Sequence, residues 1–111
     1  MLFKTPKEFF DTAESVRRIT RDEELDLAKR MREGDDASAK DELITAYLPV
    51  LASYIRRYSR EPSEEFIRRA VETLTDAVSG FDFRVENPTF VNFLRGRMRS
   101  LVTELIADGV V

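Results

Sequence analysis

The sequence contains no cysteine and no histidine. Their absence excludes a disulfide scaffold, a thiolate or imidazole zinc site, a cysteine nucleophile and any catalytic triad that needs a histidine base. Glycine is also scarce, and its four occurrences, at 34, 80, 96 and 109, are isolated from one another, so no glycine-rich phosphate loop exists. Because only four glycines and four prolines interrupt a chain that is 35% charged, the composition predicts a helical protein.

Long apolar runs are missing as well. No stretch approaches the 18 or so residues that a transmembrane helix needs, and the N-terminus lacks the apolar segment and cleavage site of a signal peptide. We therefore expect a cytoplasmic protein with no membrane partner. A length of 111 residues fits one domain, residues 1–111.

The charge is nearly balanced overall and uneven along the chain. There are 18 Lys and Arg against 21 Asp and Glu, so a uniformly basic nucleic-acid-binding surface is excluded. Residues 1–45 carry nine bases and twelve acids, whereas residues 84–103 carry four arginines and one glutamate. A local basic strip therefore remains compatible with the composition.

Five helices are predicted from capping residues that precede apolar residues at helical spacing. The first begins at Thr5-Pro6 and places Val16 and Ile19 on its apolar side. The second begins with the capping box from Thr20 to Glu23 and ends at Gly34, which we expect at the C′ position.

Asp35 or Asp36 caps a third, longer helix that runs to about residue 58. Pro49 falls within it, so we expect a kink near 45–49 or a break there, and the apolar period that continues past this residue favours the kink. A fourth helix follows Ser63, and a fifth runs from residue 89 to about 107. No segment alternates with period two, so the predicted fold class is all-α, a compact bundle of about five helices.

Paired carboxylates offer no catalytic site. They occur at Asp35-Asp36, Asp41-Glu42 and Glu64-Glu65, at predicted helix starts where capping and the helix dipole explain them. We find no enzyme signature, no metal site and no cofactor-binding motif.

The arginines of the last helix carry more information. Arg95, Arg97 and Arg99 lie beside Phe90 and Phe93, and arginines interleaved with aromatic rings are typical of a surface that binds single-stranded nucleic acid. The alternative is a solvated helix face whose two phenylalanines belong to the core.

A second arginine cluster fits a solvated helix face. Helical spacing would pair Arg68 with Glu64 or Glu72, and Arg69 with Glu65. The other members of this cluster are Arg56, Arg57 and Arg60.

The order of these segments resembles regions 1.2 and 2 of bacterial RNA polymerase sigma factors, of a divergent or alternative type. Residues 19–35, from Ile19 through the capping box to Asp35, are similar to region 1.2 leading into region 2. The resemblance extends over 19–108 and leaves 1–18 as an additional N-terminal helix. The segments similar to region 2 include Tyr47-Leu48-Pro49-Val50-Leu51, Phe81-Asp82, Phe90-Val91-Asn92-Phe93-Leu94 and Met98-Arg99.

The resemblance implies a transcription initiation factor without catalytic activity. Such a domain docks on the clamp helices of the β′ subunit of core RNA polymerase and captures the non-template strand of the promoter −10 element. Docking would fall on the helix over 64–79, at Glu65, Arg68, Arg69 and Glu72. Strand capture would fall on Phe90, Asn92, Phe93, Arg95, Arg97 and Arg99, with Ser100 and Thr103 facing the upstream edge of the element.

Two departures from the family pattern give a second hypothesis. Many members carry Gln-Glu where this chain has Arg68-Arg69, and the tryptophan pair of housekeeping members falls at Gly96-Arg97. Like charges facing the basic polymerase surface would weaken docking. The chain could instead be a sigma-like regulator or decoy that binds an acidic protein and does not itself recognise promoters, or a helical interaction domain unrelated to sigma factors.

Further partners follow from what the chain lacks. It has no segment for the −35 element, so we expect a separate subunit to supply that recognition, and an anti-sigma factor is another candidate partner. With a net charge of −3, DNA binding is expected only in complex with polymerase.

Overall fold

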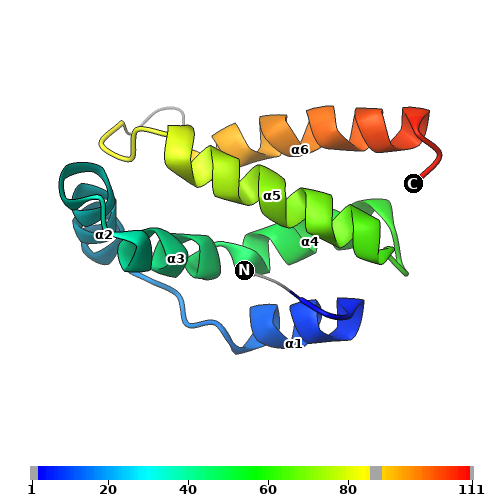
Figure 1. Cartoon of the computed structure of the whole chain (residues 1–111), viewed down its shortest axis with the longest axis horizontal. Coiled ribbons are helices and arrows are strands. Elements are labelled where there is room, and N and C mark those ends of the chain that lie inside the picture. The colour runs from blue at the N-terminus through cyan, green and yellow to red at the C-terminus, as the bar shows by residue number, and fades with distance from the viewer. Residues whose placement is uncertain (1–2, 86–88, 111) are drawn as a thin grey trace.

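The computed structural model describes residues 3–85 and 89–110, and every regular element in them is an α-helix (Figure 1). The all-α prediction is confirmed, but the helices number six rather than five. They are α1 (Pro6–Ser15), α2 (Arg21–Gly34), α3 (Ala37–Ala46), α4 (Leu48–Tyr58), α5 (Glu64–Gly80) and α6 (Phe90–Ala107).

The sixth helix arises because the predicted third helix breaks at Tyr47. This residue leaves helical geometry with φ −97° and ψ 1°, and its N–H donates to the carbonyl of Ile44 at 3.2 Å. Pro49 then occupies the second position of α4, where its missing N–H has no helical partner to lose. The favoured kink was wrong and the alternative, a break near 45–49, is confirmed, since a new helix start accommodates the proline better than a strained continuous helix would.

The predicted helix starts are confirmed by side-chain caps at every helix except α4. The α2 cap is a full capping box, in which Thr20 accepts from the Glu23 N–H and Glu23 accepts from the Thr20 N–H, both at 3.1 Å. These caps are local, so the sequence alone predicts them. The remaining N-cap side chains are Thr5, Asp36, Ser63 and Thr89.

Two predicted helix ends were wrong. Asp35, not Gly34, takes the left-handed conformation after α2, with φ 49°. The first helix ends at Ser15, and the residues from 16 to 20 form a linker in which Val16 and Ile19 remain half-buried. The linker reaches the next capping box, so these apolar residues pack from extended backbone rather than from a helix.

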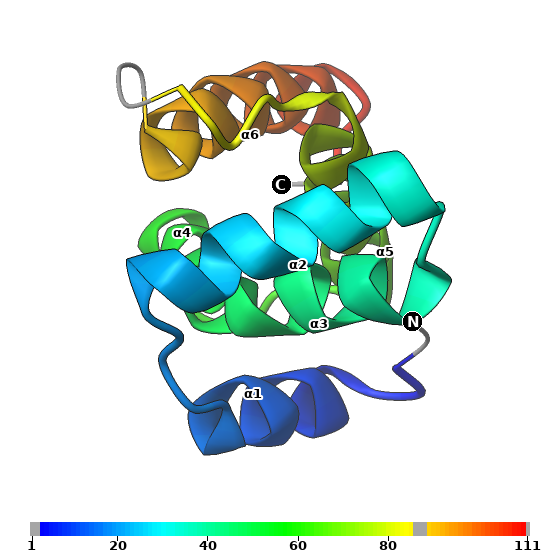
Figure 2. The same cartoon turned by 90° about the vertical axis from the view of Figure 1, so that its left-hand side faces the viewer.

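The helices are arranged around α5, which contacts α1, α3, α4 and α6. Figure 1 shows α6 along one side of the molecule, α5 next to it and α1 on the opposite side. The view in Figure 2 shows α2 lying along α3, with α4 and α5 to either side behind them. Buried residues of all six helices join in one hydrophobic cluster.

The loop after α5 is held by an aromatic group and by α2. The buried rings of Phe81 and Phe83 lie 5.3 and 5.0 Å from that of Phe90. Arg21 donates to the Phe83 carbonyl at 2.8 Å, and Arg32 bonds Asp82 at 3.0 Å. These contacts anchor the loop at residues 81–83, the Val85 N–H donates to the Asp82 carbonyl at 3.1 Å, and residues 86–88 lie outside the described residues.

No helix in the described part of the chain is both long and apolar enough to cross a membrane.

Candidate functional site

The predicted strand-binding residues of α6 face different directions. Arg95 donates from Nε to the hydroxyl of Tyr54 on α4 at 3.2 Å, and Arg99, one turn later, projects on the same side. Arg97 instead lies over the Phe93 ring at 5.1 Å and, with Ser100, lines a groove against α5. The arginines that are contiguous in the sequence thus divide between two sides of the helix.

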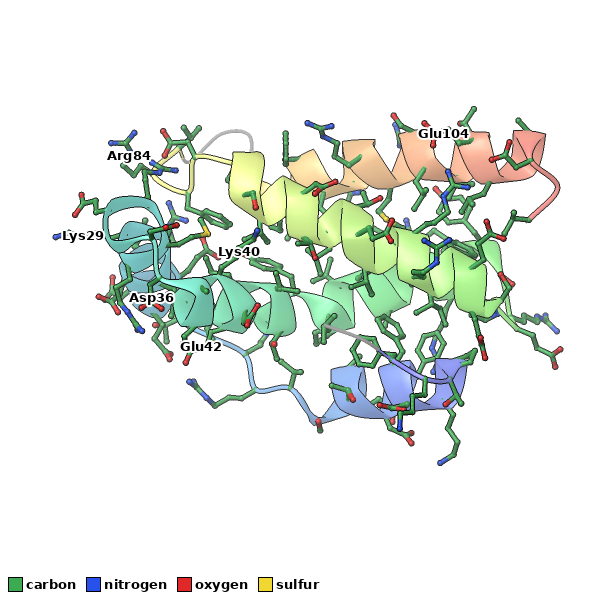
Figure 3. All side chains as sticks on the ribbon, in the orientation of Figure 1. Lys29, Asp36, Lys40, Glu42, Arg84 and Glu104 are labelled. Carbon is green, nitrogen blue, oxygen red and sulfur yellow. The ribbon has the colours of Figure 1, made fainter. Side chains whose placement is uncertain are left out.

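The α5 side of this helix is not strongly basic. The groove there has a volume of about 200 Å³ and contains the carboxylates of Asp76 and Glu104 as well as Arg97. Glu104 is labelled on α6 in Figure 3. Two acids against one arginine do not favour a phosphate backbone.

The α4 side is basic and aromatic. The guanidinium groups of Arg57 and Arg95 lie 5.7 and 5.9 Å from the ring centre of Tyr54, which is 6% exposed. Tyr58, one turn beyond Tyr54, is 40% exposed. Among the described residues, Arg57, Arg95 and Arg99 form no ion pair. We call Tyr54, Arg57, Tyr58, Arg95 and Arg99 the α4–α6 strip.

The strip is continuous because α4 and α6 run in the same direction. Tyr47, at the start of α4, lies 4.5 Å from Phe90 at the start of α6, and Tyr54 meets Arg95 farther along. Sequence reasoning assigned the α4 arginines to a solvated face and missed this contribution. Residues 50–60 contain three arginines, two tyrosines and no acid, a composition that could have indicated it.

The two phenylalanines of α6 have different environments. Phe90 is 4% exposed and stacks on Phe83 at 5.0 Å, so its ring is part of the core. Phe93 is half-buried, with its ring 5.1 Å from that of Phe81. The core alternative is therefore correct for Phe90, whereas Phe93 keeps an accessible side.

Three polar residues occupy the outer surface of α6. Asn92, Ser100 and Thr103 are exposed. The Ser100 and Thr103 hydroxyls donate to the carbonyls one turn earlier at 3.4 and 3.0 Å, which leaves their oxygens able to accept from a ligand.

The two docking arginines predicted on α5 also lie on different sides of their helix. Arg68 is exposed and pairs with Glu72 at 3.0 Å, as its spacing predicted. Arg69 donates to Glu104 at 3.1 Å and to Asp108 at 3.3 Å, both from α6 and its C-terminal end. The predicted Arg69–Glu65 pair was wrong, because the helix turns Arg69 toward α6 and away from Arg68.

The outer side of α5 forms a groove with the N-terminal segment. Its volume is about 940 Å³, and Phe3, Thr5 and Pro6 line its second side. We call it the α5 groove. Its α5 residues are Glu64, Glu65, Ile67, Arg68, Val71, Glu72, Thr75 and Asp76, so predicted docking residues Glu65, Arg68 and Glu72 are all present.

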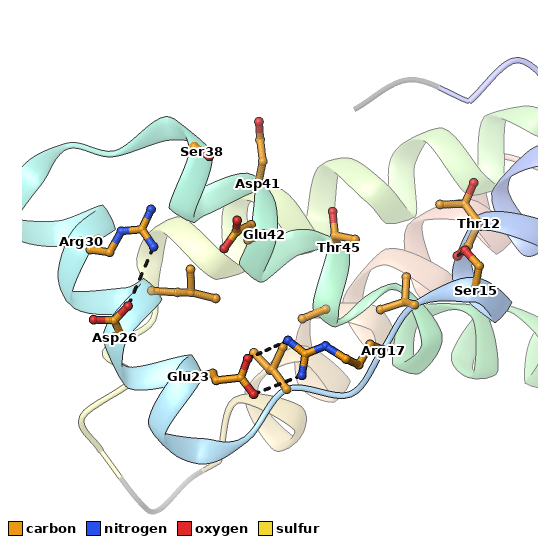
Figure 4. A pocket seen from close by; sticks show the side chains of 14 residues that line it. Thr12, Ser15, Arg17, Glu23, Asp26, Arg30, Ser38, Asp41, Glu42 and Thr45 are labelled. Carbon is orange, nitrogen blue, oxygen red and sulfur yellow. Dashed lines mark hydrogen bonds and ion pairs between the residues drawn. The ribbon is translucent and has the colours of Figure 1, made fainter.

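A further groove, of about 670 Å³, lies between α1, the 16–20 linker, α2 and α3 (Figure 4). Arg17 on the linker donates to both carboxylate oxygens of Glu23, at 3.2 and 2.7 Å. These hydrogen bonds, with the backbone hydrogen bond from Thr20, lower the pKa of Glu23 to about 2. The pair fastens the linker to α2, and no predicted site residue lines this groove.

No group of three or more acidic side chains within residues 3–85 and 89–110 is placed to hold a metal ion. In the same residues, every buried side-chain nitrogen and oxygen has a hydrogen-bond partner.

Comparison with known proteins identifies one segment. Residues 15–37 match the family model for sigma-70 factor, region 1.2, and these residues span the linker, α2 with its capping box and the start of α3. No curated protein sequence and no solved structure matches the chain significantly. The segment at 15–37 is thus similar to sigma-70 region 1.2, which supports a sigma-factor-like domain and a sigma-factor-related role in transcription.

Proposed function

We propose that the chain is a sigma-factor-like initiation domain that docks on the β′ clamp helices of core RNA polymerase through α5. On the α4–α6 strip it engages the non-template strand of the promoter −10 element. The match of residues 15–37 to region 1.2 carries this proposal. It is supported by the separation of an acidic surface on α5 from a basic, aromatic surface on α4 and α6.

The docking half of the proposal depends on charge. The α5 groove carries four carboxylates, and Arg68 is its one arginine among the residues that line it. Arg69 is occupied by Glu104 and Asp108, so it does not oppose the basic polymerase surface that the resemblance implies. A net acidic groove favours a basic partner through electrostatic complementarity.

The strand-binding half depends on the α4–α6 strip. Arg57, Arg95 and Arg99 can neutralise phosphates, and the exposed Tyr58 offers a stacking surface for a base. Asn92 and Thr103 lie exposed on the same helix as Arg95 and can contact base edges, whereas Ser100 lines the groove against α5. Phe93 and Arg97, on the other side of α6, would meet the strand only where it crosses the helix.

Charge reversal in the α5 groove tests docking. We expect Glu65→Lys with Glu72→Lys to weaken binding of the full chain to core polymerase and to the isolated clamp-helix fragment at least tenfold, as like-charge contacts in interfaces do. Glu33→Lys, an exposed change on α2, is the matched control and should bind like the wild type. Failure of the wild type to bind either target would overturn the proposal.

A regulator or decoy is the second candidate function. It is favoured by the burial of Phe90 and by Gly96 and Arg97 at the positions of the family's tryptophans, because fewer rings remain for base stacking. The two functions differ in one assay. An initiator bound to polymerase retains a single-stranded −10 oligonucleotide, whereas a decoy occupies polymerase, retains no oligonucleotide and lowers transcription from added promoters.

A further inference from the structure

The N-terminal segment before α1 has a fixed position against the rest of the molecule. The ring of Phe3 packs edge-on against that of Phe9 at 5.2 Å, and Phe9 is fully buried. Thr5 caps α1 by accepting from the Glu8 N–H at 3.1 Å. Phe3 is itself half-buried against the core, so the segment is held by packing and capping together.

This position makes the segment one side of the α5 groove. Phe3, Thr5 and Pro6 face the groove from one side, and α5 faces it from the other. The apolar residues Ile67 and Val71 lie along the α5 side. Without residues 3–6, α5 would present an open helix surface rather than a groove.

The groove has the dimensions and chemistry of a helix-binding site. The α5 residues that line it run from Glu64 to Asp76, about 18 Å along the helix axis at 1.5 Å per residue. Carboxylates lie at both ends of this stretch. Between them Ile67 and Val71 are only 4% and 6% exposed, so the accessible apolar surface of the groove is mainly that of the partly buried Phe3 and Pro6. An amphipathic helix with an apolar stripe and basic flanks is complementary to that pattern.

We propose that residues 3–6 form the second wall of the docking groove and that the groove receives one basic, amphipathic helix of the polymerase, with Phe3 contacting its apolar stripe. This inference rests on the proposed function, since it takes the clamp-helix region as the source of the bound helix. It assigns a binding role to a part of the chain for which the sequence resemblance offers none.

The same geometry allows an opposite role, in which the segment is a lid that competes with the partner. The two roles predict opposite effects of removing the Phe3 ring. A wall residue contributes contact area, so its loss weakens binding, whereas a lid residue obstructs the groove, so its loss strengthens binding. Affinity of a variant at this position therefore decides between them.

The experiment measures the affinity of the full chain for the β′ clamp-helix fragment by calorimetry, with Phe3→Ala, Phe3→Leu and Lys4→Ala. Phe3→Ala should weaken binding about tenfold, consistent with loss of a largely apolar contact. Phe3→Leu restores an apolar side chain and should recover most of the affinity. Lys4→Ala is the matched control, since Lys4 is exposed and does not line the groove. Thermal melts of each variant verify that α1 remains folded.

The outcomes separate the two proposals. If the wild type binds and Phe3→Ala binds equally well, the proposal that residues 3–6 form a wall of the groove is wrong, whereas the proposal of polymerase docking is retained. If Phe3→Ala binds more tightly, the segment is a lid. If the wild type binds neither the fragment nor core polymerase, the proposed function itself is overturned. If sedimentation shows a dimer that Phe3→Ala dissociates, a second copy of the chain is the occupant and the basic-helix assignment is wrong.

Discussion

Phe90 and Phe93 are three residues apart on one helix and contribute in different ways. Phe90 is packed among Tyr47, Phe81 and Phe83, with ring centres 4.5 to 5.3 Å away. Phe93 touches the same cluster at its edge and is half-buried. A large aromatic side chain in the core stabilises the fold much more than one at its border.

We expect Phe90→Ala to lower the free energy of unfolding by about 3–5 kcal/mol, the range for an aromatic residue removed from a core. Phe93→Ala should cost clearly less, because part of its ring remains in solvent in the folded state. Urea denaturation followed by circular dichroism measures both. Equal losses for the two variants would mean that Phe93 is as much a core residue as Phe90.

Glu23 links stability to pH through a single carboxylate. Its pKa in the folded protein is about 2, below the ordinary value, chiefly because Arg17 donates to it. A carboxyl whose pKa is depressed by folding stabilises the protein at pH values above its unfolded pKa, and that stabilisation is lost as pH falls toward the folded pKa.

We therefore expect the stability of the wild type to fall between about pH 5 and pH 2, with Glu23 contributing part of the loss. Glu23→Gln should be less stable than the wild type at pH 7, and the difference should shrink at pH 2.5. Because the chain has no histidine, stability should change little between pH 6 and 8. Urea midpoints measured across this range test both statements, with the exposed Glu33→Gln as control.

At the scale of elements, one arginine joins the two helices proposed to bind different partners. Arg69 on α5 reaches Glu104 and Asp108 at the end of α6. Its side chain is largely covered, whereas both acids are exposed, so the pair is weaker than a buried one. The contact holds the C-terminal turns of α6 against α5.

Arg69→Gln should lower the free energy of unfolding by about 0.5–1 kcal/mol, as expected for a partly exposed ion pair. The effect on local opening of the C-terminal turns of α6 should be larger than the effect on the free energy of global unfolding. Amide hydrogen exchange should become faster over residues 104–110, whereas exchange in α2 and α3 should stay the same. Arg68→Gln removes the neighbouring exposed pair with Glu72 and is the matched control, with no expected change near 104–110.

At the scale of the whole molecule, the two surfaces carry opposite charge. The α5 groove is acidic, and the α4–α6 strip carries arginines without acidic partners in the described residues. Arg84, which lies in the loop before α6, is instead paired with Asp82 at 2.9 Å. The acidic surface opposes DNA binding by the isolated chain, and a basic partner bound there would remove this opposition.

The complex with polymerase should bind a single-stranded −10 oligonucleotide with a salt dependence that reflects the strip. Three arginine–phosphate contacts contribute about −2 to the slope of log affinity against log salt concentration. Arg95→Ala with Arg99→Ala should weaken binding and reduce this contribution to about −1. Fluorescence anisotropy at several salt concentrations measures both quantities.

Arg97→Ala is the control for this prediction, because Arg97 lies on the α5 side of the helix. It should change the slope less than the double variant does. A larger effect on the slope from Arg97→Ala than from the Arg95→Ala, Arg99→Ala double variant would mean that the strand binds on the other side of α6.

The sequence by itself determined the local features. Thr5, Thr20, Ser63 and Thr89 precede the helices that they cap, and the absence of period-two alternation excluded a sheet from the outset. Capping and i,i+4 pairing, such as that of Arg68 with its neighbour, depend on residues within one turn, so a linear pattern contains them. The region 1.2 similarity is also contiguous and was recognisable for the same reason.

Only the tertiary structure decided which long-range partner each side chain meets. The packing of α5 on α6 turned Arg69 toward Glu104, and the parallel run of α4 and α6 brought Tyr54 to Arg95. The tertiary structure also placed Phe3 beside α5, although the two are sixty residues or more apart in the sequence. These contacts depend on how helices cross and in which direction they run, which no local spacing specifies.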